Sequence, residues 1–258
     1  MIQHEIKALK HLGQHFLADE SIIQKIVDAI VSMDEPGLWI EIGPGTGAIT
    51  GPLLKHFGNR LQLAEIDQRS VEVLSNKFNL NAGSFCGDFL QLNLQEIAPQ
   101  NPIHLVGNLP YNIGSQILFR VLDNRSLVNA CVFMFQKEVA ERICSGPGNK
   151  DYGILSVLLQ AFYRCDYLFT VDENAFVPPP RVKSGVMKMQ RLEAPRIKSE
   201  AAFFKQVVKT AFNQRRKTLR NSLKSMMKPG QMDIPFASLR PEQLSVEQFD
   251  ELCFYLKG

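Results

Sequence analysis

Amphipathic and buried segments alternate along the first two thirds of the chain. Residues 19–33 carry isoleucine and valine at i, i+4 spacing, which predicts a helix with one apolar face. Short apolar runs typical of strands occupy residues 38–42, 61–66, 84–86, 103–107, 131–135, 167–171 and 185–192. Strands separated by helical segments predict an α/β fold built on a doubly wound parallel sheet.

The end of the chain has a different pattern. A proline-rich loop over 177–181 joins the last two predicted strands, so we expect them to form an antiparallel hairpin at one edge of the sheet. Beyond the break at residues 193–196 only helical spacing is found. The sequence therefore predicts two domains, an α/β domain over 1–194 and a small all-helical domain over 195–258.

Composition limits the class of protein. A chain of 258 residues with 45% hydrophobic and 21% charged residues is typical of a soluble globular protein. Its longest apolar stretches are too short to cross a bilayer, and the N-terminus lacks the pattern of a secretion signal. The five cysteines are scattered and form no C-x-x-C pair, which favours reduced thiols over disulfides or a metal site. We expect a cytoplasmic protein without membrane or metal.

Positive charge is concentrated in one segment. Ten basic residues and one acid, Glu200, lie between Arg196 and Lys228, giving about +9, while the formal net charge of the whole chain is only +3. A basic patch on an otherwise acidic protein is typical of a polyanion-binding surface. The alternative is a solvated basic helix face.

A glycine turn and two acids predict a nucleotide site. Gly43, Gly45 and Gly47 follow the strand at 38–42, although their spacing departs from the dinucleotide fingerprint G-x-G-x-x-G. Glu65, near the end of the next strand, can accept both hydroxyls of a ribose, which fits NAD or S-adenosylmethionine. Asp88 follows the strand after that and can accept from an adenine amine. Either acid alone is more often a helix cap, but their common register favours a site for the sulfonium cofactor.

The tetrapeptide Asn108-Leu109-Pro110-Tyr111 follows the strand at 103–107. The Asn108 side-chain oxygen and a main-chain carbonyl near Leu109 or Pro110 can hold both N–H groups of an adenine amine, and Tyr111 offers a ring for stacking. Pro110 has no N–H to compete and biases Leu109 toward extended geometry. An ordinary turn is the alternative, since Asn-x-Pro is common in turns.

With these motifs in order, the chain resembles the small-subunit ribosomal RNA adenine dimethyltransferases of the KsgA type over nearly its full length. The resemblance rests on six motifs, which are Gly13–Leu17, Glu41–Gly47 with Glu65–Asp67, Gly87-Asp88, Asn108–Tyr111, Phe176–Ser184 and Gln214–Asn221. His15 departs from the pattern, because the family usually has asparagine at this position.

The resemblance implies a Rossmann-like methyltransferase domain followed by a helical RNA-binding domain. It implies that S-adenosyl-L-methionine methylates two adjacent adenines in the 3′-terminal hairpin of 16S rRNA, within the immature small ribosomal subunit, and that the protein acts as a monomer. The implied cofactor-binding residues are His15, Leu17, Gly43, Gly45, Glu65, Asp88 and Asn108. The target adenine is expected between Tyr111 and Phe176, and the implied RNA-binding residues are Arg215, Arg216, Lys217 and Arg220.

Two other functions fit much of the same sequence. One is an rRNA-binding assembly or transcription factor that keeps the fold without turnover, against which the intact Asn108, Tyr111, Glu65 and Asp88 argue. The other is a relative acting on large-subunit rRNA, which would keep the same cofactor site. The basic segment around Arg215–Arg220 favours the small subunit.

Overall fold

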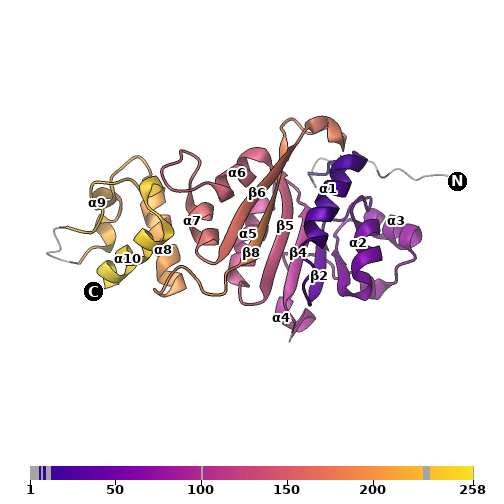
Figure 1. Cartoon of the computed structure of the whole chain (residues 1–258), viewed down its shortest axis with the longest axis horizontal. Coiled ribbons are helices and arrows are strands. Elements are labelled where there is room, and N and C mark those ends of the chain that lie inside the picture. Colours follow the sequence, from indigo (N-terminus) through magenta and orange to yellow (C-terminus); the bar gives the residue numbers. More distant parts are fainter. Residues whose placement is uncertain (1–5, 7, 10–12, 100, 229–232, 258) are drawn as a thin grey trace. The chain divides into compact units, whose positions relative to one another are not determined.

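The computed structural model describes residues 6, 8–9, 13–99, 101–228 and 233–257. The chain divides into two compact units (Figure 1). The first unit takes the chain up to Ala140 together with Asp166–Gln190, and the second takes Glu141–Cys165 together with the chain from Arg191 onward. The chain therefore passes between the units three times, and not once as a division at residue 194 implies.

The first unit is built around a six-stranded sheet with the order β3-β2-β4-β5-β8-β6. Its strands are β2 (Leu38–Ile42), β3 (Leu61–Ala64), β4 (Ile103–Asn108), β5 (Val128–Gln136), β6 (Tyr163–Val171) and β8 (Ser184–Arg191). Strand β2 pairs in parallel with β3 and β4, and β4 with β5, whereas β8 runs antiparallel to β5. The fold is thus a doubly wound α/β sheet, with β8 and β6 as neighbours at one edge.

Ten α-helices are assigned within the described residues. They are α1 (Glu20–Val31), α2 (Thr50–Phe57), α3 (Gln68–Phe78), α4 (Leu94–Ile97), α5 (Gly114–Asp123), α6 (Lys137–Cys144), α7 (Ile154–Gln160), α8 (Ala201–Asn213), α9 (Leu219–Ser222) and α10 (Val246–Lys257).

Helix α1 begins where its sequence predicts. The Asp19 carboxylate accepts hydrogen bonds from the backbone N–H groups of Ser21 and Ile22, which satisfies two donors of the first turn. Its apolar stripe is fully used, because the buried residues of the helix are Ile23, Ile26, Val27 and Ile30.

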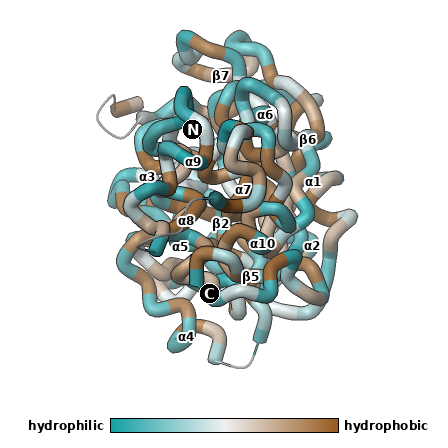
Figure 2. The backbone as a smooth tube through the Cα atoms, turned by 90° about the vertical axis from the view of Figure 1, so that its left-hand side faces the viewer, coloured by the Kyte–Doolittle hydropathy of each residue, from teal (hydrophilic) through white to brown (hydrophobic). Residues whose placement is uncertain are grey.

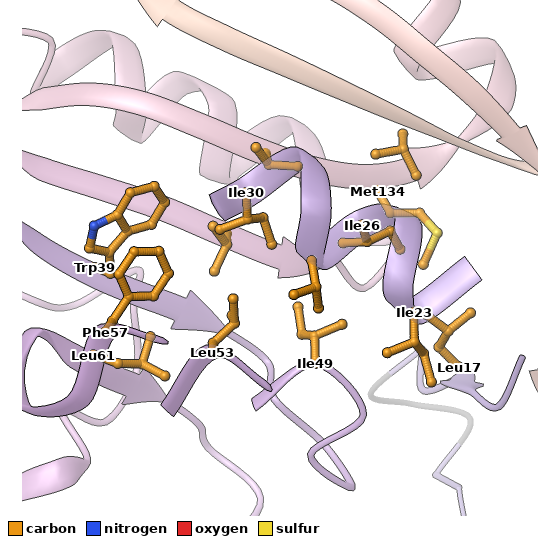
Figure 3. Packing of buried hydrophobic residues seen from close by; sticks show 14 of the residues in the cluster. Leu17, Ile23, Ile26, Ile30, Trp39, Ile49, Leu53, Phe57, Leu61 and Met134 are labelled. Carbon is orange, nitrogen blue, oxygen red and sulfur yellow. The ribbon is translucent and has the colours of Figure 1, made fainter. Parts of the chain in front are cut away.

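The stripe of α1 packs into the core of the first unit (Figure 3). Ile30 points toward Leu53 of α2, and the Trp39 ring of β2 stacks on Phe57 with centroids 4.3 Å apart. On β5 the alternating residues Ala130, Val132 and Met134 belong to this core. This side of the sheet therefore carries helices α1 and α2.

The opposite side of the sheet is covered by α5. Phe133 and Phe135, which alternate with Val132 and Met134 along β5, are buried as well. A Cβ atom on Gly114, the first residue of α5, would lie 3.0 Å from Cδ1 of Phe135, so helix and strand are in close contact. Because β5 is buried on both sides, it is hydrophobic along most of its length. Helix α3 is more hydrophilic (Figure 2).

A separate two-stranded sheet joins distant parts of the first unit. Strand β1 (Phe16–Leu17) pairs antiparallel with β7 (Phe176–Val177), and Leu17 lies opposite Phe176. The predicted strand at 84–86 is reduced to one parallel bridge, between Phe85 and Leu63. Gly83 and Gly87 flank this segment, and glycine disfavours extension of a strand.

The second unit is helical, as predicted for the end of the chain, but it also includes α7. Helices α7, α8 and α10 pack against one another. Phe212 of α8 stacks on Phe249 of α10, with ring centroids 5.9 Å apart. The buried Asp250 carboxylate accepts from the backbone N–H groups of Lys198 and Ser199, which fixes the segment leading to α8.

Candidate active site

A pocket lies at the carboxyl ends of β2, β3 and β4. The chain leaves β2 toward β3 on one side and later returns to its other side as β4, and ligands bind at such switch points of open α/β sheets. The predicted site residues that line the pocket are His15, Leu17, Gly43, Gly45, Glu65, Asp88, Asn108, Leu109, Pro110 and Tyr111.

The glycine turn after β2 lets the backbone approach its neighbours closely. Gly45 has φ +56°, and a Cβ atom there would lie 3.0 Å from Cε1 of Phe16. Gly47 has φ +79°, and its Cβ would lie 2.7 Å from Cδ2 of Leu74 in α3. Both positions combine a left-handed backbone with a lack of room, so a larger residue would disturb the turn, part of which lines the pocket.

Glu65 is held rigidly at the end of β3. Its Oε1 atom accepts from the backbone N–H groups of Ile66 and Asp67, both at 2.9 Å, and Oε2 accepts from Gly45 at 3.1 Å. Burial raises the pKa of this carboxyl, although the three hydrogen bonds oppose the shift. Each carboxylate oxygen has more than one lone pair, so Glu65 keeps acceptor capacity toward the pocket.

Glu41 is a second buried acid in the pocket, and the sequence interpretation gave it no role. The side chain is 1% exposed, and burial raises its pKa to about 8. Its Oε2 atom has no hydrogen-bond partner among the described residues. A buried acceptor without a partner is costly unless a ligand supplies a donor, so Glu41 fits a cationic or N–H-bearing group.

Asp88 is exposed at the rim of the pocket. Its Oδ1 atom accepts from the backbone N–H of Leu90 at 2.9 Å, which forms a turn after the Phe85 bridge. The adjoining Phe89 is buried and also lines the pocket. A carboxylate and an apolar side chain therefore lie next to each other in the chain at this part of the pocket.

The orientation of the Asn108 amide is fixed by its surroundings. Asn108 ends β4, and its Nδ2 atom donates to the main-chain carbonyl of His15 at 3.0 Å. Because a carbonyl only accepts, the amide nitrogen must face His15 and the Oδ1 atom must face elsewhere. The next residue, Leu109, donates its N–H to the Met134 carbonyl of β5, which anchors the tetrapeptide to the sheet.

Tyr111 is held at two points. Its hydroxyl forms a 2.8 Å hydrogen bond with Oγ of Ser184, the first residue of β8, and Ser184 is fully buried. The His15 ring stacks on the Tyr111 ring, with centroids 5.6 Å apart and planes inclined by 28°. Burial raises the pKa of the Tyr111 phenol, so the hydroxyl keeps its proton at neutral pH.

The Gly13–Leu17 segment connects several parts of the pocket. Gln14 donates from Nε2 to the Asp67 carboxylate at 2.9 Å, and its Oε1 atom accepts from the backbone of Leu9. The Arg69 guanidinium and Gln14 hold the pKa of Asp67 down, at about 2. Asp67 is therefore ionised at neutral pH and binds the segment to the loop that carries Glu65.

Phe176 lies elsewhere than its expected position beside the target base. It is 2% exposed, belongs to the hydrophobic core and pairs with Leu17. The pocket lining includes His15 and Tyr111 but not Phe176. The ring in contact with Tyr111 in this structure is that of His15.

Comparison with known proteins identifies the class of site. Residues 6–253 match the family described as ribosomal RNA adenine dimethylase. The chain belongs to this family. The ribosomal RNA small subunit methyltransferase A of Flavobacterium johnsoniae is 51% identical over 248 residues, covering 95% of this chain and 94% of that protein. The protein of the same name from Cytophaga hutchinsonii is 47% identical over 256 residues, covering 98% and 99%.

Solved structures show the same fold. A dimethyladenosine transferase from Plasmodium falciparum has a TM-score of 0.75 at 23% identity, covering 94% of this chain and 98% of that one. The 23S rRNA methyltransferase ErmE has a TM-score of 0.68 at 24% identity, covering 92% and 99%. The predicted Rossmann-like methyltransferase fold is therefore confirmed.

Membership of the dimethylase family implies a methyl donor of the S-adenosylmethionine type and an rRNA substrate. The charges of the pocket agree with such a donor. Its described lining holds three carboxylates, Glu41, Glu65 and Asp88, and no lysine or arginine. A cationic sulfonium with an amino group suits these acids and would favour the ionised form of Glu41, whereas the diphosphate of NAD would find no cationic side chain in this lining.

The predicted RNA-binding side chains of this dimethylase differ in how freely they can reach a ligand. Arg215 donates from Nη2 to the Lys150 carbonyl, and its Nε atom lies 3.7 Å from the Glu242 carboxylate. Arg220 pairs with Asp233 at 3.1 Å, with both side chains exposed. Arg216 and Lys217 are exposed between them. Of the four RNA-binding residues predicted from the sequence, Arg215 and Arg220 thus have partners within the second unit.

Metal sites and membrane spans can be assessed for the described part of the chain. Within that part, no group of three or more histidine, cysteine or acidic side chains is arranged to hold a metal ion. None of the helices described is both long and apolar enough to cross a bilayer.

Proposed function

We propose that this chain transfers methyl groups from S-adenosyl-L-methionine to two adjacent adenines in the 3′-terminal hairpin of 16S rRNA. The substrate would be the immature small ribosomal subunit in the cytoplasm, and the enzyme would act as a monomer. The observation that carries the proposal is the fixed Asn108 amide, whose oxygen is free to accept from an adenine amine in a pocket lined by carboxylates.

The cofactor would be held by residues of the first unit. Glu65 would accept from the ribose hydroxyls, Asp88 from the adenine amine and Glu41 from the amino group of the methionine part. The main chain at Gly43, Gly45, His15 and Leu17 would line the remainder of the site. When bound, S-adenosylmethionine supplies an electrophilic methyl group.

The Asn108–Tyr111 tetrapeptide would hold the target adenine. Asn108 Oδ1 would accept one N6–H. The Pro110 carbonyl already accepts from Ile113 at 3.2 Å, which favours the Leu109 carbonyl as the second acceptor. Two acceptors draw the amine out of conjugation with the ring and aim its lone pair, so most of the acceleration comes from positioning.

Tyr111 would stack on the flipped base. Removing a base from its stack costs about a few kcal/mol, and base–aromatic stacking returns roughly 1–3 kcal/mol. The stacking assigned to Phe176 on the sequence alone has no support from its buried position beside Leu17. A conformational change would be needed to bring that ring to the base.

The small subunit is favoured over the large one by the similarity of relatives. Proteins that are 47–51% identical over nearly the whole chain are named for the small subunit, whereas ErmE, named for 23S rRNA, is 24% identical. An assembly factor without turnover is disfavoured, because Asn108, Tyr111 and Glu65 are all present and held by specific contacts.

The second unit would bind the RNA backbone through the exposed cations Arg216, Lys217 and Arg220. Arg215 would hold this segment in place through its hydrogen bond to the Lys150 carbonyl. The proposal assigns one function to each unit, as the sequence analysis did for the two domains. Methyl transfer would belong to the unit that carries the sheet, and RNA binding to the helical unit, which includes α7.

The proposal is tested by incubating the protein with undermethylated small subunits and mapping methylated nucleotides by mass spectrometry. Two adjacent dimethyladenosines in the 3′-terminal hairpin are expected. Asn108→Ala should lower the single-turnover rate by about 10²–10³-fold, with RNA affinity nearly unchanged. Asn59→Ala, which changes an exposed asparagine of the same unit, is the control. Methylation of 23S rRNA instead, or a wild-type rate for Asn108→Ala, would refute the assignment.

A further inference from the structure

His15 is the centre of three contacts in the pocket. Its carbonyl accepts from the Asn108 amide at 3.0 Å, its Nδ1 atom lies 2.9 Å from the Pro178 carbonyl, and its ring stacks on Tyr111. The first contact uses the main chain and would survive any substitution. The other two need the imidazole ring, which replaces the asparagine expected from the resemblance.

The contact with Pro178 determines the state of the ring. A carbonyl oxygen cannot donate, so Nδ1 must carry the proton in this arrangement. The ring is thereby tethered to the loop between β7 and β8. The same loop ends at Ser184, which binds the Tyr111 hydroxyl. His15 and the loop therefore hold each other while both contact Tyr111.

Tyr111 is restrained from two directions as a result. Ser184 fixes the tip of the side chain, and His15 covers one face of the ring at a centroid distance of 5.6 Å. An aromatic ring has two faces, so an incoming base would stack on the other one. A ring that is already fixed loses less conformational entropy when the base arrives, which favours binding.

We propose that His15 is a positioning residue for the target base, which acts by supporting Tyr111 from behind and tying it to the Pro178 loop. This inference rests on the proposed stacking role of Tyr111. His15 would not touch the reacting atoms. Its side chain would set the affinity for the flipped base, while its carbonyl sets the orientation of Asn108.

Three variants separate the contacts. His15→Ala removes both the ring and the tether, His15→Asn keeps an N–H donor without a ring, and His15→Phe keeps a ring without the donor. Capture of the target base is measured on small subunits that carry 2-aminopurine at the target position, and S-adenosylmethionine affinity is measured by calorimetry. His56→Ala, which removes a histidine paired with Asp34 at 2.9 Å, serves as the control.

Base capture should weaken by about 2- to 10-fold in His15→Ala and His15→Asn, the range expected for one aromatic pair. His15→Phe keeps the stacked ring but loses the tether to Pro178, so its loss should be smaller than that of His15→Asn. Cofactor affinity and the rate at saturating RNA should change less than KM in all three variants. His56→Ala should match the wild-type protein. Because His15→Asn introduces the residue usual in the family, it provides a folded variant even if His15→Ala is unstable.

The decisive measurement combines His15→Asn with Tyr111→Ala. If His15 acts through Tyr111, its substitution has no further effect once the tyrosine ring is gone. An equal loss of capture in both backgrounds would overturn the inference. Stronger capture by His15→Ala would also overturn it, since the ring would then be an obstacle. If Tyr111→Ala alone leaves capture unchanged, the proposed stacking function fails instead, independently of His15.

Discussion

The hydrogen bond between the hydroxyls of Tyr111 and Ser184 can be tested by removing each hydroxyl separately. Tyr111→Phe keeps the stacking ring and removes only the hydroxyl. Ser184→Ala removes the partner. Because Ser184 is fully buried whereas Tyr111 is half-buried, the two single changes should not be equivalent.

Burial sets the expected size of each effect. Tyr111→Phe leaves the Ser184 hydroxyl buried without its partner, which costs about 1–3 kcal/mol of the free energy of unfolding. Ser184→Ala leaves the hydroxyl on a half-buried ring that water can reach, so the loss should be about 0.5–1.5 kcal/mol. The double variant removes both groups. Its loss in the free energy of unfolding should therefore be smaller than the sum of the two single losses, by a coupling energy of roughly 1 kcal/mol.

The chain offers a convenient probe for this measurement. Trp39 is the single tryptophan and is buried in the first unit, stacked on Phe57. Its fluorescence during urea unfolding therefore reports the stability of the unit that contains Tyr111 and Ser184. The midpoint and slope are recorded for the wild-type protein and the three variants.

Two results would refute the reasoning. If both single variants lost less than about 0.5 kcal/mol of the free energy of unfolding, the hydrogen bond would contribute no more than an ordinary surface contact. Strictly additive losses would show that the two hydroxyls do not interact in solution. Full methyl-transfer activity of the double variant would show that the two hydroxyls have no chemical role in the reaction.

Two further predictions concern buried and basic side chains. The pKa of Glu41 is raised from an ordinary 4.5 to about 8, so the folded state binds this proton more tightly than the unfolded state does. The free energy of unfolding should therefore fall as pH rises from about 4.5 to 8. Glu41→Gln should flatten this part of a pH series of urea midpoints, and an unchanged slope would contradict the prediction. Arg215→Ala should lower the thermal midpoint, because Arg215 holds the Lys150 carbonyl, whereas the Arg216→Ala/Lys217→Ala variant should keep the midpoint and flatten the salt dependence of subunit binding. Equal midpoints for the two proteins would exclude the supporting role of Arg215.

Short apolar runs located the strands of the central sheet, because these strands are largely buried, but did not fix the bounds of all of them. The runs at 38–42 and 103–107 predicted β2 and β4 to within one residue, whereas the run at 131–135 covers only part of β5. The segment at 84–86 was predicted with the same rule but forms only a bridge at Phe85. Pattern alone does not tell how many residues find a partner strand.

The division of the chain was harder to predict. Residues 141–165 have an apolar helical pattern, and such a pattern indicates burial without indicating the partner. In the structure Tyr152 lies against Phe212 of α8, with ring centroids 6.4 Å apart, so this segment belongs with the end of the chain. Contacts across 60 residues leave no signal in local spacing.

Site residues were predictable where the chemistry is local to a strand end. Glu65 follows β3, Asp88 follows the bridge at Phe85 and Asn108 ends β4, and all three line one pocket. The function of Phe176, Arg215 and His15 depends on which distant residue each one contacts. Phe176 is packed in the hydrophobic core and does not line the pocket, and Arg215 donates a hydrogen bond to the Lys150 carbonyl. Only the fold reveals such partners.

The contacts of His15 and Tyr111 also determine when, during synthesis of the chain, the Tyr111 side chain can be fixed in place. His15 meets Pro178 across 163 positions of the chain, and Tyr111 meets Ser184 across 73. Contacts of such long range form late, because closing a long loop costs entropy before any interaction compensates it. A nascent chain that has emerged only as far as Asn108 already contains the motifs for the cofactor, but Tyr111, Pro178 and Ser184 are still inside the ribosome. The Tyr111 ring, which we propose captures the base, is therefore fixed only after more than two thirds of the sequence has been translated.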